Sequence, residues 1–277
     1  MLGGVCAAMK HITSRDNPLF KDLLRLSNAS RGTRREEGRT VLDGVHLIRA
    51  YFDRFGRQSV ELIVKDAARG HPEIAALAEG ARAVSMADGI FDDVAPVQSP
   101  VGVLALIPIP ELGIGPPGAG FQVLIDGVQE PGNLGSILRA AAAAGARLAH
   151  LSPQCADPWS PRSLRGGMGA QFLLPIQEHP DLSAAARRLR VPIVACSVHA
   201  SMSLFDLDMR GELAFAVGSE GAGISPQLLE CAQHRIRIPM RPGMESLNAA
   251  GAATVCFYEW LRQQEAGVDR ASRVPPK

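Results

Sequence analysis

The stretch DGVQEPGNLGSILRAAAAAG, from Asp126 to Gly145, decides how this chain is interpreted. An apolar, strand-like run, FQVLI at 121–125, leads into it, and an alanine-rich, helix-like run leads out. Polar groups and a Pro-Gly turn lie between the two, and a single arginine, Arg139, interrupts the alanines. Because open α/β folds bind ligands at the carboxyl ends of their strands, this polar junction predicts part of a ligand site.

The alternation of strands and helices continues from there towards the C-terminus. The strand candidates are FQVLIDGV (121–128), ARLAHLSP (146–153), QFLLPIQE (171–178), VPIVACSV (191–198), LAFAVGSE (213–220) and HRIRIPM (234–240). The helix candidates are 133–145, 181–190, 225–232 and 246–264. Apolar strands that alternate with helices in this way are typical of an α/β fold, a parallel sheet with helices on both faces.

The preceding residues predict a separate, smaller α/β domain. A strand and a helix are expected within 40–55. Further strands are expected at 60–66, 81–86 and 101–109, with a helix at 72–80 between the first two of them. A Pro- and Gly-rich stretch follows and reads as a linker. The expected organisation is a first domain at 1–107, a linker at 108–120, a second domain at 121–265 and a flexible tail at 266–277.

Composition narrows the classes of protein. The net charge of +1 over 277 residues excludes a uniformly basic nucleic-acid binder. Basic residues are dense only within 10–39, where a helix is expected after Asp16-Asn17-Pro18; this segment is either a solvated surface or a contact surface for RNA phosphates. The five cysteines are dispersed, which favours reduced thiols and no structural zinc. No apolar run approaches the roughly 18 residues that span a membrane, so we expect a cytoplasmic protein.

Two more polar clusters follow strand candidates: AFAVGSEGAGIS at 214–225, and RIPMRPGMESLNAAGAATVCFYEWL at 237–261. Gly218, Gly221 and Gly223 allow a tight turn and a close approach of backbone to a ligand. Their spacing is neither that of a dinucleotide-binding loop nor that of a phosphate-binding P-loop. Taken alone, each cluster could equally be a plain turn.

Taken together, three segments resemble the three motifs of the SpoU/TrmH family of RNA ribose 2'-O-methyltransferases, in the same order. They are NLGSILRAAAAAG, VGSEGAGIS and IPMRPGMESLNAAGAA. The N-terminal segments ITSRDNPLFKDLLRL and RREEGRTVLDGVHLI are similar to the substrate-binding domain of family members that act on ribosomal RNA. The resemblance covers about residues 10–264.

The resemblance implies a deep trefoil knot in the second domain, a bent S-adenosylmethionine as cofactor, no metal, and a homodimer with active sites near the subunit interface. The residues expected to bind the cofactor are Gly218, Glu220, Gly221, Ile238, Met240 and Leu247. The residues expected to act in catalysis are Asn133, Arg139, Glu220, Ser246 and Asn248.

Arg139 is expected to point into the site, anchor an RNA phosphate and stabilise charge on the ribose oxygen. A guanidinium with a pKa above about 12 resists acting as a general base, so the base stays unassigned. The leading hypothesis is 2'-O-methylation of 23S ribosomal RNA. A tRNA ribose methyltransferase and a noncatalytic RNA-binding knot protein are the alternatives. An enzyme with a nucleotide cofactor is disfavoured because both phosphate-binding loops are missing.

Overall fold

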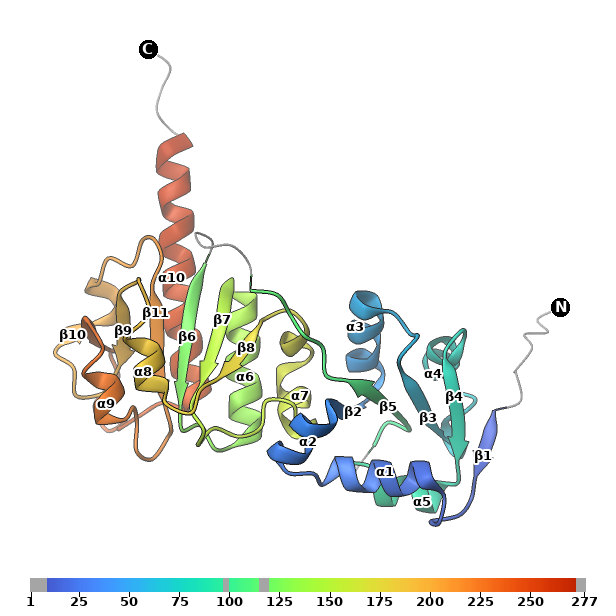
Figure 1. The fold of residues 1–277 in the computed structure, drawn as a ribbon. Helices are drawn as coiled ribbons and strands as arrows, with labels where there is room; N and C mark the ends of the chain where they lie inside the picture. Colours follow the sequence, from blue (N-terminus) through green and yellow to red (C-terminus); the bar gives the residue numbers. More distant parts are fainter. Residues whose placement is uncertain (1–8, 97–99, 115–119, 273–277) are drawn as a thin grey trace. The chain divides into compact units, whose positions relative to one another are not determined.

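The computed structural model describes residues 9–96, 100–114 and 120–272, the last six of these by their backbone alone. These residues form two compact units (Figure 1). The first comprises the chain up to Pro110 together with Asp157–Phe172, and the second comprises Glu111–Ala156 and the chain from Leu173 onwards. The alternation in the sequence had placed 157–172 inside the second domain, whereas its contacts lie with the first unit.

The first unit contains a five-stranded mixed sheet of order β1-β4-β3-β5-β2. Strands β1, β4 and β3 run parallel, and β5 runs antiparallel to both β3 and β2. The strands are β1 (Lys10–Ile12), β2 (Arg39–Asp43), β3 (Glu61–Lys65), β4 (Arg82–Met86) and β5 (Val103–Pro108). The helices are α1 (Pro18–Ser27), α2 (Arg31–Glu37), α3 (Val45–Phe55), α4 (Pro72–Ala78), α5 (Asp88–Val94) and α7 (Pro161–Gly167), with short 3-10 turns η1 (Asp66–Ala68) and η2 (Ala170–Phe172).

Successive side chains along these strands point to opposite faces of the sheet and belong to two separate hydrophobic cores. Leu62 and Val64 of β3 pack with α3 and α4, and Ile63 packs with α1 and α5. The strands and helices expected between 40 and 109 are all present, with ends shifted by at most two residues. The structure adds β1, α2 and α5, which are three, seven and seven residues long and so are too short to show a clear apolar period in the sequence.

The segment 157–172 is part of the first unit's core. Leu164 and Phe172 are buried in the same cluster as α3. The Thr40 hydroxyl donates a hydrogen bond of 2.7 Å to the carbonyl of Trp159, next to the contact between α7 and β2. The chain therefore passes between the two units three times, near residues 110, 156 and 172.

The second unit is built on a seven-stranded sheet of order β10-β12-β9-β11-β6-β7-β8. Every pairing in it is parallel, which confirms the predicted parallel sheet. The strands are β6 (Phe121–Asp126), β7 (Ala146–Leu151), β8 (Ile176–Glu178), β9 (Ile193–Cys196), β10 (Met202–Ser203), β11 (Ala214–Gly218) and β12 (His234–Arg237). The helices are α6 (Pro131–Ala143), α8 (Leu182–Ala186), α9 (Pro226–Leu229) and α10 (Ala249–Ser272), with the 3-10 turn η3 (Leu204–Asp206).

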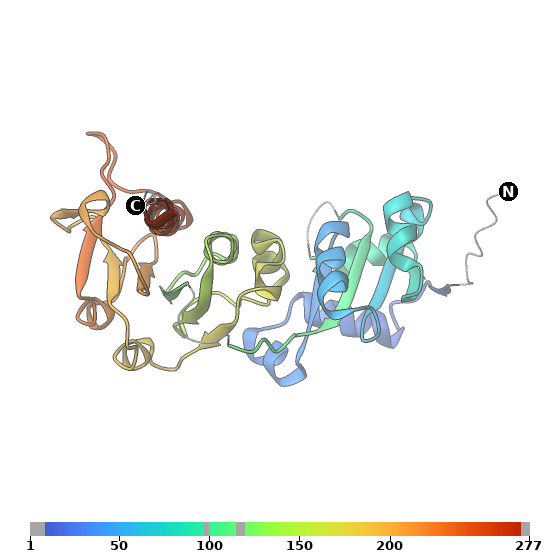
Figure 2. The same cartoon turned by 90° about the horizontal axis from the view of Figure 1, so that it is seen from above.

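Helices cover both faces of this sheet. On one face, Phe121 and Phe215 form an aromatic cluster with Phe257 and Trp260 of α10. On the other, small and branched side chains of the strands pack against α8 and α9. Figure 2 shows α10 (red) and α6 (green) on one side of the strands, and α8 and α9 on the other. Among the described residues, no helix is both long and apolar enough to cross a bilayer.

Candidate cofactor and active site

A cavity of about 280 Å³ lies at the carboxyl ends of β9, β11 and β12. Its walls are the loop after β9 (196–199), the end of β11 with the loop that follows (217–224), two side chains after β12, and the start of α10. Ligands of open parallel sheets bind at this edge, so the location agrees with the polar clusters found in the sequence.

All six residues expected to bind a cofactor line this cavity: Gly218, Glu220, Gly221, Ile238, Met240 and Leu247. Ser246, expected to act in catalysis, lines it as well. Asn133, Arg139 and Asn248 do not line it. The structure thus brings the second and third sequence motifs to one cavity and places the first motif beside it.

Only glycine fits at position 218, because the loop after β11 packs closely against it. Ser219 and Gly223 exchange two backbone hydrogen bonds, of 3.1 and 3.0 Å, and close a tight hairpin. A Cβ atom on Gly218 would lie 2.1 Å from the carbonyl carbon of Gly223, a separation that no side chain tolerates. Gly223 itself has a positive φ of 69°. Glycine at 218 therefore lets the hairpin fold back onto the strand end.

Asn133 connects the three motifs. Its Nδ2 donates a hydrogen bond to Oε1 of Glu220 in the second motif. Its Oδ1 accepts a hydrogen bond of 3.1 Å from Nδ2 of Asn248 in the third motif. Asn248 also caps α10, because its Oδ1 accepts from the backbone N–H of Ala250 at 2.9 Å. This cap explains why α10 begins at Ala249 and not at 246, as expected from the sequence.

Two carboxylates that had been given no role hold these loops. Glu130 caps α6, since its Oε2 accepts a hydrogen bond of 2.6 Å from the backbone N–H of Asn133. Asp126 Oδ2 accepts one of 2.9 Å from the backbone N–H of Ser225, beyond the 219–223 hairpin. The sequence signalled the start of this helix through Pro131 at its first position, but not the role of Glu130, because the usual N-terminal caps are Ser, Thr, Asp and Asn.

Arg139 lies away from the cavity. It is on α6, six residues after Asn133 and so about 9 Å further along the helix axis. Its side chain is exposed, and within the described part of the chain it makes no hydrogen bond or ion pair. In a single copy of the chain it does not point into the cavity, contrary to the expectation from sequence.

A thiol also lines the cavity. A hydrogen bond with Cys256 lowers the pKa of the Cys196 thiol, and burial opposes that effect. Cys256 lies on α10 and its thiol has a pKa well above the ordinary value, because of the same contact and of burial. Groups of three or more potential metal ligands are absent among the described residues.

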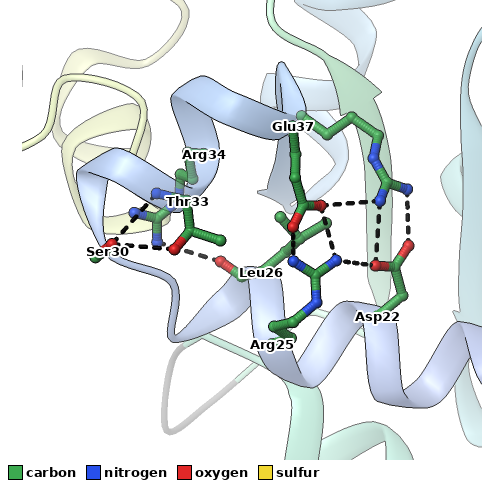
Figure 3. A network of polar contacts seen from close by, with 8 residues as sticks. Asp22, Arg25, Leu26, Ser30, Thr33, Arg34 and Glu37 are labelled. Atoms are coloured by element: carbon green, nitrogen blue, oxygen red, sulfur yellow. Dashed lines mark hydrogen bonds and ion pairs between the residues drawn. The ribbon is translucent and has the colours of Figure 1, made fainter.

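The basic N-terminal segment is largely occupied by internal ion pairs. Arg25 contacts both Asp22 and Glu37, and Arg39 contacts the same two acids (Figure 3). Burial by itself raises the pKa of Asp22, but hydrogen bonds from Arg39 and Arg25 outweigh it and hold that pKa below its ordinary value. These arginines are neutralised by their neighbours, so they contribute less to a phosphate-contact surface than the sequence suggested.

Three comparisons with known proteins agree on the family. The model of the SpoU rRNA methylase family matches residues 120–258. An uncharacterized tRNA/rRNA methyltransferase of Synechocystis is 32% identical, over 92% of this chain and 94% of its own length. The 23S rRNA (guanosine(2553)-2'-O)-methyltransferase of Bacillus subtilis is 29% identical, over 90% of this chain and 98% of its own length.

Solved structures are similar across both units. The crystal structure of an RNA 2'-O ribose methyltransferase matches with a TM-score of 0.79 and 29% identity, over 91% of this chain and 98% of that one. The SpoU methyltransferase AviRb of Streptomyces viridochromogenes, solved in complex with its cofactor AdoMet, matches with a TM-score of 0.78 and 27% identity, over 89% and 98%. On these grounds and on the match of its three motifs, the chain belongs to the SpoU rRNA methylase family.

Proposed function

We propose that the protein transfers a methyl group from S-adenosylmethionine to a ribose 2'-hydroxyl of 23S ribosomal RNA. The observation that carries this proposal is the meeting of the three motifs: Asn133 bonds both Glu220 and Asn248, beside a cavity lined by every residue expected to bind the cofactor. The names of the Bacillus relative and of the AdoMet-bound structural neighbour support the same reaction. A substrate of this kind would place the protein in the cytoplasm.

The cavity suits this cofactor in size and lining. Its volume is near the lower end of the roughly 300–1,000 Å³ of small-molecule sites, which fits a compact, bent ligand. Val217, Ile238 and Leu247 offer apolar walls, and the glycines at 218 and 221 expose backbone groups for hydrogen bonds. When bound, S-adenosylmethionine supplies an electrophilic methyl group.

The side chains of the protein then have to orient the ribose and stabilise the negative charge that develops on its 2' oxygen. The hydrogen bond between Asn133 and Glu220 fixes the two loops against each other, with Glu220 lining the cavity. Asn248 holds the start of α10 by its cap, and Ser246 lines the cavity from the third loop. Arg139 would anchor an RNA phosphate and stabilise charge on the ribose oxygen.

Two finer features of the family are proposed for this chain. The first is the deep trefoil knot, supported by the position of the cavity between the loops after β11 and β12 and the start of α10. The second is a homodimer formed through the second unit. Its support is the exposed position of Arg139, which needs a further surface beside it to enclose an active site.

The first unit is proposed to bind RNA. Its support is the structural match over about nine-tenths of the chain to an RNA 2'-O ribose methyltransferase, which includes this unit. Because several of its arginines are paired internally, we expect this unit to recognise RNA by shape and hydrogen bonds as much as by charge.

Methyl transfer from radiolabelled S-adenosylmethionine to 23S rRNA and, separately, to tRNA tests the proposal. We expect label on 23S rRNA, loss of that label with Arg139→Ala, and wild-type label with Arg190→Ala, which removes an exposed arginine outside the motifs. Label on tRNA alone would favour the alternative substrate. Cofactor and RNA binding with no label on rRNA, tRNA or ribosomal precursor particles would point to a noncatalytic knot protein.

A further inference from the structure

The second unit contains a second cavity, of about 720 Å³, which shares part of one wall with the first. Ser219, Ala222 and Gly223 of the hairpin line both cavities. The other walls of the second cavity come from the loops after β6 and β7 and from the starts of α8 and α9. None of the residues expected to act in catalysis lines it.

Part of this wall is fixed by internal hydrogen bonds. Asp126 holds the backbone N–H of Ser225, and the Ser152 hydroxyl accepts a bond of 2.9 Å from the backbone N–H of Gly127. Asp181 caps α8 by accepting a bond of 2.9 Å from the backbone N–H of Ala184. The first two contacts join loops that surround the cavity and the third fixes the start of α8, so the outline of the cavity is preorganised.

Other polar side chains of the same wall are uncommitted. Gln129, Gln154, Arg187 and Gln227 line the cavity, and in the described part of the chain their side chains make no hydrogen bond or ion pair. A primary amide presents a donor and an acceptor side by side, which matches the hydrogen-bonding edge of a nucleobase. A guanidinium binds phosphate oxygens, or stacks on a base.

The charges limit what the cavity can hold. Arg187 is its one cation, and Asp126 and Asp181 are two carboxylates, among the described residues that line it. A ligand with several phosphates would be repelled, whereas a base with a single phosphate can place the phosphate at Arg187 and its polar edge at the amides. The volume lies within the range of sites that bind ligands of this size.

We propose that this cavity binds the base of an unstacked RNA nucleotide that is the neighbour, along the strand, of the nucleotide being methylated. This inference rests on the proposed function. The neighbour is assigned, and not the target, because Asn133, Glu220 and Asn248 bond to one another beside the first cavity, while the second begins on the same 219–223 hairpin. Base-specific contacts here would select the sequence around the methylation site.

Nucleotide binding tests the cavity without any methyl transfer. Each of the four nucleoside 5'-monophosphates is added to the full chain by saturation-transfer NMR, with S-adenosylhomocysteine present to block the first cavity. Base protons should receive saturation from the wild type and from Arg188→Ala, which removes the adjacent, exposed arginine outside the cavity. The double variant Arg187→Ala/Gln227→Ala should lose the effect. The absence of transfer in the wild type, or unchanged transfer in the double variant, overturns the proposal.

RNA substrates test the position of the nucleotide. Once the methylated ribose is mapped, fragments are made with an abasic residue at one neighbour or the other. For one of the two, the wild-type kcat/KM should fall by about tenfold, which is the scale of one good base contact, and the double variant should no longer respond. If neither abasic residue lowers kcat/KM, the cavity does not bind a neighbouring base during methyl transfer, and the proposal is wrong. If the wild type methylates no RNA, the proposed function fails, and the saturation-transfer experiment still decides whether the cavity binds a base.

Discussion

Asn248 donates a hydrogen bond of 3.1 Å to Asn133, although the two residues are 115 positions apart in the sequence. The same Asn133 side chain donates to Glu220. One amide thus uses its donor towards the second motif and its acceptor towards the third. Because an amide carries both functions on one short side chain, no other residue type of similar size can replace Asn133 in both contacts.

Replacing Asn133 by Asp should therefore be more harmful than replacing it by Ala. N133D removes the donor and places a second carboxylate against Glu220, so the two loops repel each other. We expect N133A to lower kcat for methyl transfer by about a hundredfold, with N133D lower still and with weakened S-adenosylmethionine affinity. Steady-state kinetics and calorimetry measure the two effects. N28D, at an exposed residue of the first unit, is the control and should change neither.

Gly218 and Gly221 form a matched pair for testing the cavity. A methyl group at Gly218 would collide with the backbone of Gly223, whereas one at Gly221 meets no protein atom within 4 Å. Gly218→Ala should open the hairpin and weaken S-adenosylmethionine binding by more than about tenfold, and Gly221→Ala should keep the hairpin closed. Equal affinities for the two variants, measured by calorimetry, would show that the hairpin does not shape the cofactor site.

The sequence predicted which loops gather at the cavity because the signals of those loops are local. Strand ends, glycines and a helix cap mark the three motif loops, and Gly218, Ile238 and Leu247 all line the cavity. The contact between Asn133 and Asn248 is long-range and leaves no periodic trace in the sequence. Arg139 is the opposite case: its isolation among alanines predicted a place in the site, but the helix turns it towards solvent in one copy of the chain.

The boundaries of the second unit were harder to predict, for physical reasons. QFLLPIQE at 171–178 has the apolar composition of a buried strand, yet β8 begins only at Ile176. Its first residues form the 3-10 turn that inserts Phe172 into the core of the first unit. Composition reveals that a residue is buried, but not which core buries it, so the assignment of 157–172 could not be made from the pattern of apolar residues.

Breaking the ion pair between Arg34 and Asp157 should destabilise that segment, because it would leave one charge buried without its partner. Its N–O distance is 2.6 Å, and the two side chains are only 4% and 10% exposed. Arg34→Met leaves the Asp157 charge buried without its partner, and should lower the free energy of unfolding of the first unit by roughly 3 kcal/mol. Adding Asp157→Leu should recover most of that loss, since a buried pair replaced by apolar groups is often neutral.

The two tryptophans allow this to be measured in one unit at a time. Trp159 belongs to the first unit and Trp260 to the second, so a Trp260→Phe background leaves Trp159 as the only tryptophan, which can be excited selectively over the two tyrosines. Urea unfolding in that background compares the single and double variants. A single variant that loses less than about 1 kcal/mol would mean that Asp157 finds water or another partner once Arg34 is gone.

His150 gives the second unit a dependence on pH. It is buried on β7, with Nδ1 at 2.8 Å from Nε2 of His179 and Nε2 at 2.9 Å from Oε1 of Gln122. Because Gln122 Oε1 can only accept, the proton of neutral His150 is on Nε2, and Nδ1 accepts from His179. Burial is the largest cause that lowers the pKa of His150, to about 4, with further contributions from His179 and Arg147.

The folded-state pKa of His150 is below its unfolded value of about 6.5, so its contribution to stability is complete above pH 6.5 and is lost as the pH falls towards 4. We expect the second unit to lose roughly 2 kcal/mol between pH 7 and pH 4.5 on this account. His150→Gln keeps a donor and an acceptor without a titrating ring, so its loss should be smaller by that amount; His46→Gln, at an exposed histidine of the first unit, should behave as the wild type. Urea unfolding followed by Trp260 fluorescence in a Trp159→Phe background measures the difference. If the free energy of unfolding falls equally with pH in the wild type and in His150→Gln, groups other than His150 cause the acid sensitivity.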